Sequence, residues 1–357
     1  YNPVFITKEG RRQESGYVSE LITQDALAWL RAQSEKPFFL LMGHKAPHRN
    51  WNPGPNELPT FAGTRFPEPP TLRTSYDSLV SATKTVRMRI DRDMRPAEDL
   101  MVDFTPPALS DAQKLPWQAT FEKEDLEYHA QLDASGDLLG TNYQRYLRNY
   151  LRSAAAVDKS VAQVMDYLET SGRLKNTIVV YASDQGFFLG ENGWYDKRWF
   201  YEPSAGTPLL VRHPSGKKGK VVKDLTSNVD LAPTLLEWAG VPVPEDMQGK
   251  SFAGVSAGRR PAPRTSAYGH FYESDDPDHK APKYVALVTA THKIIHYYEL
   301  GEAELFDLKR DPNETRNLFR DARSVAIRRK LKAELIAEMK RLDENPEVIA
   351  KVASLPD

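Results

Sequence analysis

One short apolar run in this chain ends in polar residues whose types suit a metal ion. Residues 177–182 are β-branched and aromatic, which predicts a buried strand, and the chain continues as Ser-Asp-Gln-Gly. Ligands of an open α/β sheet bind just past the carboxyl ends of its strands, which is where Asp184 and Gln185 fall. A carboxylate beside an amide oxygen suits calcium or magnesium better than zinc. The pattern therefore predicts a site for a hard cation.

A lysine and a glutamate follow in the same stretch of sequence. Lys197 and Glu202 come after a glycine-containing loop, and a second apolar run occupies residues 208–211. A strand, an acidic loop, a lysine, a glutamate and a strand form a layout that can hold a metal and an anion close together. Each piece also has an ordinary explanation, because Asp-x-Gly after a strand is often only a turn and a single lysine is often a solvated surface residue.

A second group of polar residues follows another predicted strand. Residues 38–42 are apolar and predict a buried strand, after which come His44, Lys45 and His48. Two histidines and a lysine at the carboxyl end of a strand can form an anion site. Taken singly, each of the three is more often a surface or packing residue.

The elements that must position these residues are partly visible in the sequence. Apolar residues at helical spacing predict helices over 17–32, 142–171 and 230–239, and a charged helix over 322–342. Short strands are predicted over 284–289, 293–298 and 304–308, after a linker of glycine, proline and arginine at 256–263. A helix followed by a strand near residue 177 fits a right-handed crossover unit. The prolines gathered between residues 51 and 117 predict an irregular insertion over about 49–137.

Composition limits the class of protein. With 357 residues, the chain is long enough for a large α/β domain at 1–255 and a smaller one at 256–357. The formal net charge of −1 gives no global field that would favour nucleic acid. No apolar run approaches 18 residues, so no membrane span is expected, and without cysteine no disulfide contributes. Because doubly wound domains usually open on a strand and this chain opens on a helix, we expect it to begin partway through a domain.

Several phrases together resemble the type I sulfatases of the alkaline phosphatase superfamily. They are Ser-Asp-Gln-Gly, Leu-Gly-Glu-Asn-Gly-Trp, Asp-Lys-Arg and Tyr-Glu within residues 183–202, with Ala-Pro-His at 46–48 and Val-Asp-Leu-Ala-Pro-Thr at 229–234. The resemblance implies a mostly parallel sheet sandwiched by helices, with a smaller C-terminal subdomain of antiparallel sheet and helix. It implies that Asp184 and Gln185 bind calcium, that Lys197 binds sulfate, and that His48 serves the leaving oxygen.

Other parts of the family's site do not match. Its nucleophile is a formylglycine made from Cys or Ser in a Cys/Ser-x-Pro/Ala-x-Arg motif, and only Ser324 fits that pattern here, within the predicted C-terminal helix. Asp275-Asp276 is an adjacent acidic pair, but it does not follow a first strand and is expected to be a loop. Gly206 stands where the family usually has arginine, which removes a possible partner of Glu202.

Within the family, the same phrases and the later His-Phe-Tyr-Glu look most like bacterial enzymes related to N-acetylglucosamine-6-sulfatase. This implies a sulfated glycosaminoglycan or mucin-type glycan as substrate, and a periplasmic or secreted location. His270 and Glu273 could contribute to the substrate pocket, although a structural role is more common for a lone histidine. Two alternatives stay open, a phosphatase or phosphonate hydrolase of the same superfamily and a non-catalytic, glycan-binding fragment.

Overall fold

The computed structural model describes residues 1–34, 36–256, 264–273 and 276–355, and these form two compact units. The first unit comprises residues 1–68 and 90–177, and the second comprises residues 69–89 and 178–357. None of the described helices has both the length and the apolar character that crossing a membrane requires. Each unit is described by itself below.

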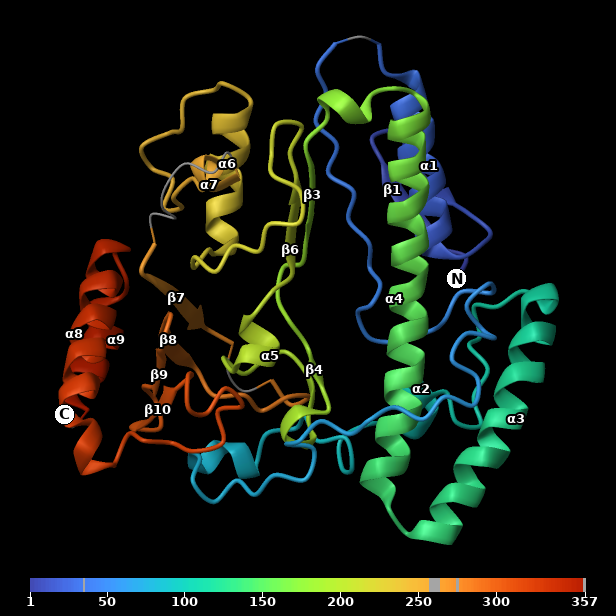
Figure 1. Ribbon diagram of the computed structural model, residues 1–357. Helices are drawn as coiled ribbons and strands as arrows, with labels where there is room; N and C mark the ends of the chain where they lie inside the picture. The colour runs from blue at the N-terminus through green and yellow to red at the C-terminus, as the bar shows by residue number, and fades with distance from the viewer. Residues whose placement is uncertain (35, 257–263, 274–275, 356–357) are drawn as a thin grey trace. The chain divides into compact units, whose positions relative to one another are not determined.

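Helices dominate the first unit (Figure 1). Its elements are β1 (Val4–Thr7), β2 (Gly10–Gln13), α1 (Val18–Ala32), α2 (Pro96–Leu100), α3 (Asp111–Ser135), α4 (Leu138–Thr170) and the 3-10 helix η2 (Leu174–Asn176). The strands β1 and β2 form an antiparallel hairpin. Helix α1 packs along α4, which confirms both predicted helices. The Asp137 side chain caps the start of α4 by accepting a hydrogen bond from the backbone N of Gly140 at 3.0 Å.

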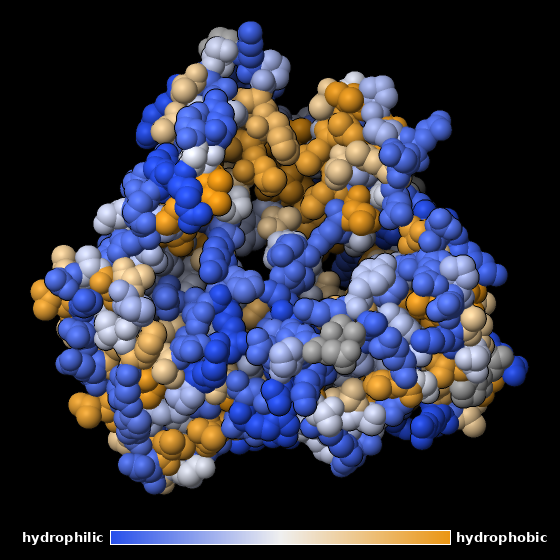
Figure 2. All heavy atoms as spheres, turned by 180° about the vertical axis from the view of Figure 1, so that it is seen from behind, coloured by the Kyte–Doolittle hydropathy of each residue, from blue (hydrophilic) through white to orange (hydrophobic). Residues whose placement is uncertain are grey.

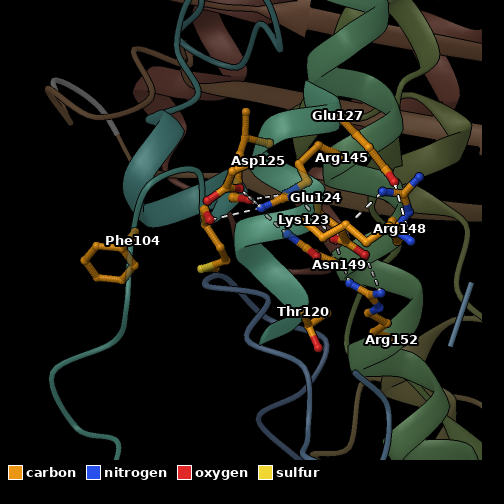
Figure 3. Close-up of polar contacts among 12 residues, drawn as sticks. Phe104, Thr120, Lys123, Glu124, Asp125, Glu127, Arg145, Arg148, Asn149 and Arg152 are labelled. Carbon is orange, nitrogen blue, oxygen red and sulfur yellow. Dashed lines mark hydrogen bonds and ion pairs between the residues drawn. The ribbon is translucent and has the colours of Figure 1, made fainter. Parts of the chain in front are cut away.

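Buried ion pairs hold α3 against α4, as Figure 3 shows. Arg145 lies 3.1 Å from Glu124 and 2.5 Å from Asp125, and Arg152 lies 2.7 Å from Glu124. A buried charge is tolerated where it is paired and hydrogen-bonded, and breaking such a pair is strongly destabilising. The irregular insertion predicted over 49–137 is therefore wrong for α3. Its buried face combines Trp117, Phe121 and Tyr128 with the carboxylates Glu124 and Asp125, which interrupt the apolar periodicity.

The described residues of the second unit form three small sheets. Their strands are β3 (Val179–Ala182) with β6 (Leu209–Arg212), β4 (Phe188–Leu189) with β5 (Tyr195–Asp196), and β7 (Ser266–Phe271), β8 (Tyr284–Thr289), β9 (His292–Tyr297) and β10 (Glu302–Asp307). Its helices are η1 (Ser81–Lys84), η3 (Glu191–Gly193), α5 (Glu202–Ala205), η4 (Asn228–Asp230), α6 (Leu231–Trp238), α7 (Ala253–Ser256), η5 (Ala322–Ser324), α8 (Val325–Arg341) and α9 (Pro346–Ser354). Helices α8 and α9 pack beside the four-stranded sheet (Figure 1). The predicted antiparallel sheet with a C-terminal helix is thus confirmed.

The strand predicted over 38–42 is wrong. The segment is extended without strand pairing, and Phe39 and Leu41 are 68% and 83% exposed. A strand needs a neighbour for its backbone N–H and C=O groups, and no described segment supplies one. In the β3–β6 ribbon, Tyr181 and Leu210 are also exposed. Figure 2, in which each residue is coloured by its hydropathy, shows hydrophobic residues in orange on the surface of the molecule. All strand pairs among the described residues are antiparallel. Most of the linker predicted at 256–263 lies outside the described residues.

A histidine in the core of the four-stranded sheet gives the second unit a pH-dependent stability. His296 of β9 has no exposed surface, and neither ring nitrogen bonds to any described residue. Burial, with the Lys332 charge nearby, lowers the pKa of His296 from 6.5 to about 3. Because the unfolded chain binds a proton at higher pH than the folded chain, this contribution to stability is fully present above pH 6.5 and is lost as the pH falls toward 3.

We predict that His296→Leu flattens the loss of stability between pH 6.5 and 4. The shift corresponds to roughly 5 kcal/mol at most, and part of that difference should disappear in the variant. Chemical denaturation at several pH values measures it. Val285→Ala, opposite His296 in the sheet, is the control, and it should lower stability equally at each pH. An unchanged slope in His296→Leu would contradict the assignment.

Candidate functional site

The polar loop that follows β3 lies against the short helix α5. The backbone N of Gly186 donates to the carbonyl of Ser204 at 2.8 Å, and the Ser204 hydroxyl donates to the carbonyl of Lys197 at 2.7 Å. Ser204 therefore ties the loop of Asp184 and Gln185 to the backbone of Lys197.

Helix α5 is in turn held by two buried carboxylates. The Tyr201 hydroxyl donates to both oxygens of Glu304 at 2.9 Å, and the backbone N of Glu202 donates to Glu314 at 2.5 Å. Glu314 is paired with Lys293 of β9 at 2.7 Å, and Lys293 Nζ also lies 3.5 Å from Glu202. Lys293 thus supplies the cation that the missing arginine at 206 would have offered to Glu202.

The site loop carries groups suited to a hard cation. Asp184 is exposed, and its Oδ1 accepts a hydrogen bond from the backbone N of Gln185 at 3.1 Å. No described residue forms a hydrogen bond with the side-chain amide of Gln185. Both side chains can therefore offer an oxygen, the donor type that calcium prefers. Two ligands are fewer than calcium needs, and within the described part of the chain no group of three or more His, Cys, Asp or Glu residues could hold a metal ion. These residues fit part of a calcium site.

The charge of Lys197 is influenced by its surroundings. Burial lowers the pKa of Lys197, and Arg198 acts in the same direction, while Asp196 and Asp184 oppose them. Asp184 is thus one of the charges that act on the Lys197 ammonium group. An anion beside Lys197 would meet its ammonium group next to the cation site.

A histidine that the sequence did not single out pairs with Asp196, the residue before Lys197. His279 Nε2 is 2.8 Å from Asp196, His279 Nδ1 is 2.6 Å from Asp276, and Arg198 is 2.7 Å from Asp196. Burial opposes the positive charge of His279, but the two carboxylates outweigh it and raise the pKa of His279. The residues on either side of Lys197 are therefore fixed by charge-assisted bonds. The only sequence signal was a histidine three residues after an aspartate.

Two of the remaining candidates from the sequence lie in packed surroundings. Ring nitrogens of His270 bond to Glu344 at 2.9 Å and to the Tyr298 hydroxyl at 3.1 Å, which favours a structural role. His44 Nε2 lies 2.9 Å from the Ser160 hydroxyl on α4, and burial lowers the pKa of His44. Ser324, which fits the nucleophile motif, is the last residue of η5 and the N-cap of α8.

Three further candidates are exposed. Lys45 and His48 are exposed in the first unit, and half-exposed Glu273 lies 3.6 Å from Arg198 in the second. The predicted convergence of His48 with Lys197 joins residues of different units and stays a prediction. Asp275 of the acidic pair lies outside the described residues, whereas Asp276 bonds to His279 as above.

Comparison with known proteins gives consistent matches over nearly the whole chain. Residues 2–241 match the family described as Sulfatase, and residues 190–341 match N-sulphoglucosamine sulphohydrolase, C-terminal. The N-acetylglucosamine-6-O-sulfatase of Bacteroides thetaiotaomicron is 36% identical over 370 residues, which cover 97% of this chain and 65% of that protein. The chain thus spans about two thirds of the length of this curated relative.

Solved structures agree with the predicted alkaline-phosphatase-like α/β fold. One, solved in complex with its substrate D-glucosamine-2-N,6-O-disulfate, has a TM-score of 0.92 and 34% identity, covering 98% of this chain and 74% of its own. A phosphonate monoester hydrolase from Silicibacter pomeroyi has a TM-score of 0.70 at 20% identity, covering 96% and 65%. The second likeness concerns the fold alone. The fold class expected from the sequence is confirmed.

We predict that Gly186→Ala disrupts the joint between the site loop and α5. A β-carbon on Gly186 would lie 2.2 Å from the carbonyl oxygen of Pro203 and 2.4 Å from that of Gly206. Overpacking of this kind costs about 1–3 kcal/mol, so thermal unfolding should begin at a lower temperature. Gly43→Ala is the matched control, because its β-carbon would meet no atom within 4 Å. Equal melting temperatures for the two variants would contradict the close approach.

Proposed function

Because the chain belongs to the sulfatase family, we propose that the protein containing it is a sulfuric ester hydrolase that removes sulfate from a sulfated sugar. The observation that carries this proposal is that Ser204 of α5 is hydrogen-bonded both to the loop of Asp184 and Gln185 and to the backbone of Lys197. These contacts support a common location for two candidate oxygen ligands and a candidate ammonium group, and a sulfate monoester needs both kinds of charge near its oxygens.

The substrate we propose is a 6-O-sulfated glucosamine or N-acetylglucosamine unit of a glycosaminoglycan or mucin glycan. Its support is the likeness to the N-acetylglucosamine-6-O-sulfatase and to the structure solved with a glucosamine disulfate. Lys45 and Glu273, with the Asp196, Arg198 and His279 group, are the polar residues that we propose for contacts with the sugar. We propose a periplasmic or secreted location on the family resemblance alone.

Each retained residue has a distinct proposed task. A calcium ion held by Asp184 and Gln185 would neutralise charge on the sulfate oxygens. Lys197 would bind the same group and stabilise charge that grows in the transition state. His48 would protonate the leaving sugar oxygen, which matters most when that oxygen is strongly basic. Convergence of His48 with the other three is part of this proposal.

The nucleophile is the part that the chain does not provide. The family makes formylglycine from Cys or Ser, whereas this chain has no cysteine and Ser324 is the N-cap of α8. Removing a nucleophile typically costs several orders of magnitude in rate. We therefore propose that residues 1–357 alone do not hydrolyse sulfate esters and that the complete protein does.

Activity assays test the function directly. The complete protein should release sulfate from N-acetylglucosamine 6-sulfate faster than phosphate from the 6-phosphate or from a phosphonate ester, and the 357-residue chain should release neither. Preference for the phosphorus esters would favour the hydrolase alternative. Turnover by the 357-residue chain would contradict the proposal that it lacks the nucleophile. If neither the chain nor the complete protein turns over any substrate, the non-catalytic, glycan-binding alternative is favoured.

Two variants of the complete protein separate the roles of Lys197 and His48. Lys197→Ala should lower kcat by about 10²–10³-fold on any sulfate ester, since it removes a charge facing the transferred group. His48→Ala should lower kcat by about 10²-fold on the sugar 6-sulfate and far less on nitrophenyl sulfate, whose leaving group needs no proton. Exposed Lys218→Ala and His129→Ala are the controls. Equal losses on both substrates would reject the acid role of His48.

Calcium binding supplies an independent measurement. Isothermal titration of the metal-free complete protein should show one calcium site that weakens at least about tenfold in Asp184→Ala and in Gln185→Ala, because each loses one oxygen ligand. Asp166→Ala removes an exposed carboxylate of α4 and should leave the affinity unchanged. Unaltered affinity in both site variants would place the calcium ligands elsewhere.

A further inference from the structure

The residue that follows His48 is clamped by a carboxylate with no exposed surface. Arg49 donates from Nε to Asp99 Oδ1 and from Nη2 to Asp99 Oδ2, both at 2.6 Å. Asp99 lies on α2 and also accepts from the backbone N of Arg95 at 2.8 Å. A two-pronged pair of this kind fixes the orientation of the guanidinium as well as its position. The backbone at Arg49 is thereby held against α2.

The carbonyl of the clamped residue orients the histidine ring. His48 Nδ1 lies 2.7 Å from the carbonyl oxygen of Arg49. A carbonyl oxygen only accepts, so Nδ1 must carry the hydrogen. The neutral ring therefore has its free lone pair on Nε2, and the protonated ring can deliver a proton only from Nε2. The bond to Arg49 selects the nitrogen that meets a substrate.

Neighbouring bonds restrict the same turn without involving the ring. The Asn50 amide donates to the carbonyl of Glu98 on α2 at 2.7 Å, the Trp51 indole donates to the carbonyl of Pro47 at 2.8 Å, and the backbone N of His48 donates to Lys45 at 2.8 Å. These bonds shape the turn, whereas the Asp99–Arg49 clamp acts on the residue whose carbonyl holds the imidazole.

We infer that Asp99 is a positioning residue for His48, acting through the Arg49 guanidinium and carbonyl to keep Nδ1 protonated and Nε2 available. The inference deepens the proposed function and rests on it for the catalytic consequence. The tautomer of His48 does not depend on that function. A buried carboxylate about 50 residues along the chain would thus set the direction in which the leaving-group acid delivers its proton.

Asp99→Asn tests the inference in the complete protein. The amide turns one acceptor oxygen into an N–H donor facing the guanidinium, so the two-pronged pair cannot form. We expect kcat on N-acetylglucosamine 6-sulfate to fall by about 10–100-fold, and kcat on nitrophenyl sulfate by less than about threefold. The nitrogen shifts of His48 in ¹⁵N-histidine-labelled protein should change from an Nδ1-protonated ring to a mixture of tautomers. The signal is assigned by its absence in His48→Gln.

A matched control exists in the same unit. Asp125 is also buried, pairs with Arg145 at 2.5 Å (Figure 3) and accepts from the backbone N of Asp103 at 2.9 Å. Asp125→Asn makes the same chemical change in a pair that forms no hydrogen bond or ion pair with residues 45–51. It should lower the melting temperature while leaving both the substrate ratio and the His48 tautomer unchanged. Arg49→Lys keeps the charge and one bond, so it serves as the second variant if Asp99→Asn does not fold.

The outcomes separate this inference from the proposed function. Equal losses on the two substrates together with an unchanged tautomer in Asp99→Asn or Arg49→Lys would reduce Asp99 to a structural residue. If His48→Ala lowers kcat equally on N-acetylglucosamine 6-sulfate and on nitrophenyl sulfate, the proposed acid role of His48 is wrong instead. The tautomer of His48 then decides alone whether Asp99 positions the ring.

Discussion

Glu304 and Glu314 hold in place the short helix on which the candidate site depends. Glu304 accepts from the hydroxyls of Tyr201 and Tyr297, and burial raises the pKa of Glu304 to about 7 in spite of these bonds. Glu314 pairs with Lys293 and accepts from the first residue of α5. A buried carboxylate is stable only where such partners compensate its desolvation. Those partners fix α5, and α5 joins Asp184 and Gln185 to Lys197.

The same physical arrangement recurs in the first unit. Asp99 holds Arg49, and Glu124 with Asp125 holds α3 to α4. The candidate residues therefore lie on loops whose shape comes from buried ion pairs and hydrogen bonds, because neither loop belongs to a long strand or helix. Such a design gives a loop a defined geometry while its tip stays open to a ligand. As a consequence, the substitutions expected to destabilise these loops most are those of buried, paired residues that do not belong to the candidate site.

The exposed apolar side chains are consistent with the chain spanning only about two thirds of its relative. Phe39, Leu41, Tyr181 and Leu210 are exposed on segments with a strand-like apolar pattern. Two-stranded ribbons are marginal by themselves, and apolar faces of this kind are normally covered in a folded protein. In these same segments the sequence predicted strands of a mostly parallel sheet, whereas the structure has the antiparallel ribbon of β3 and β6. The likeness to solved sulfatase-family structures supports the fold despite this difference.

The sequence by itself determined the family, the helices α1 and α4 and the C-terminal sheet, because these depend on local patterns and contiguous phrases. The same phrases singled out Asp184, Gln185 and Lys197 as candidate site residues. The sequence did not reveal α3, whose buried face carries Glu124 and Asp125, nor the pairing of His279 with Asp196. Nor did it show that Lys293 faces Glu202 or that Asp99 holds the residue after His48. Those contacts join residues about 20 to 90 positions apart, and a charged residue shows in sequence neither its burial nor its partner. Only the tertiary structure decides which charges are brought together, since only folding removes them from water.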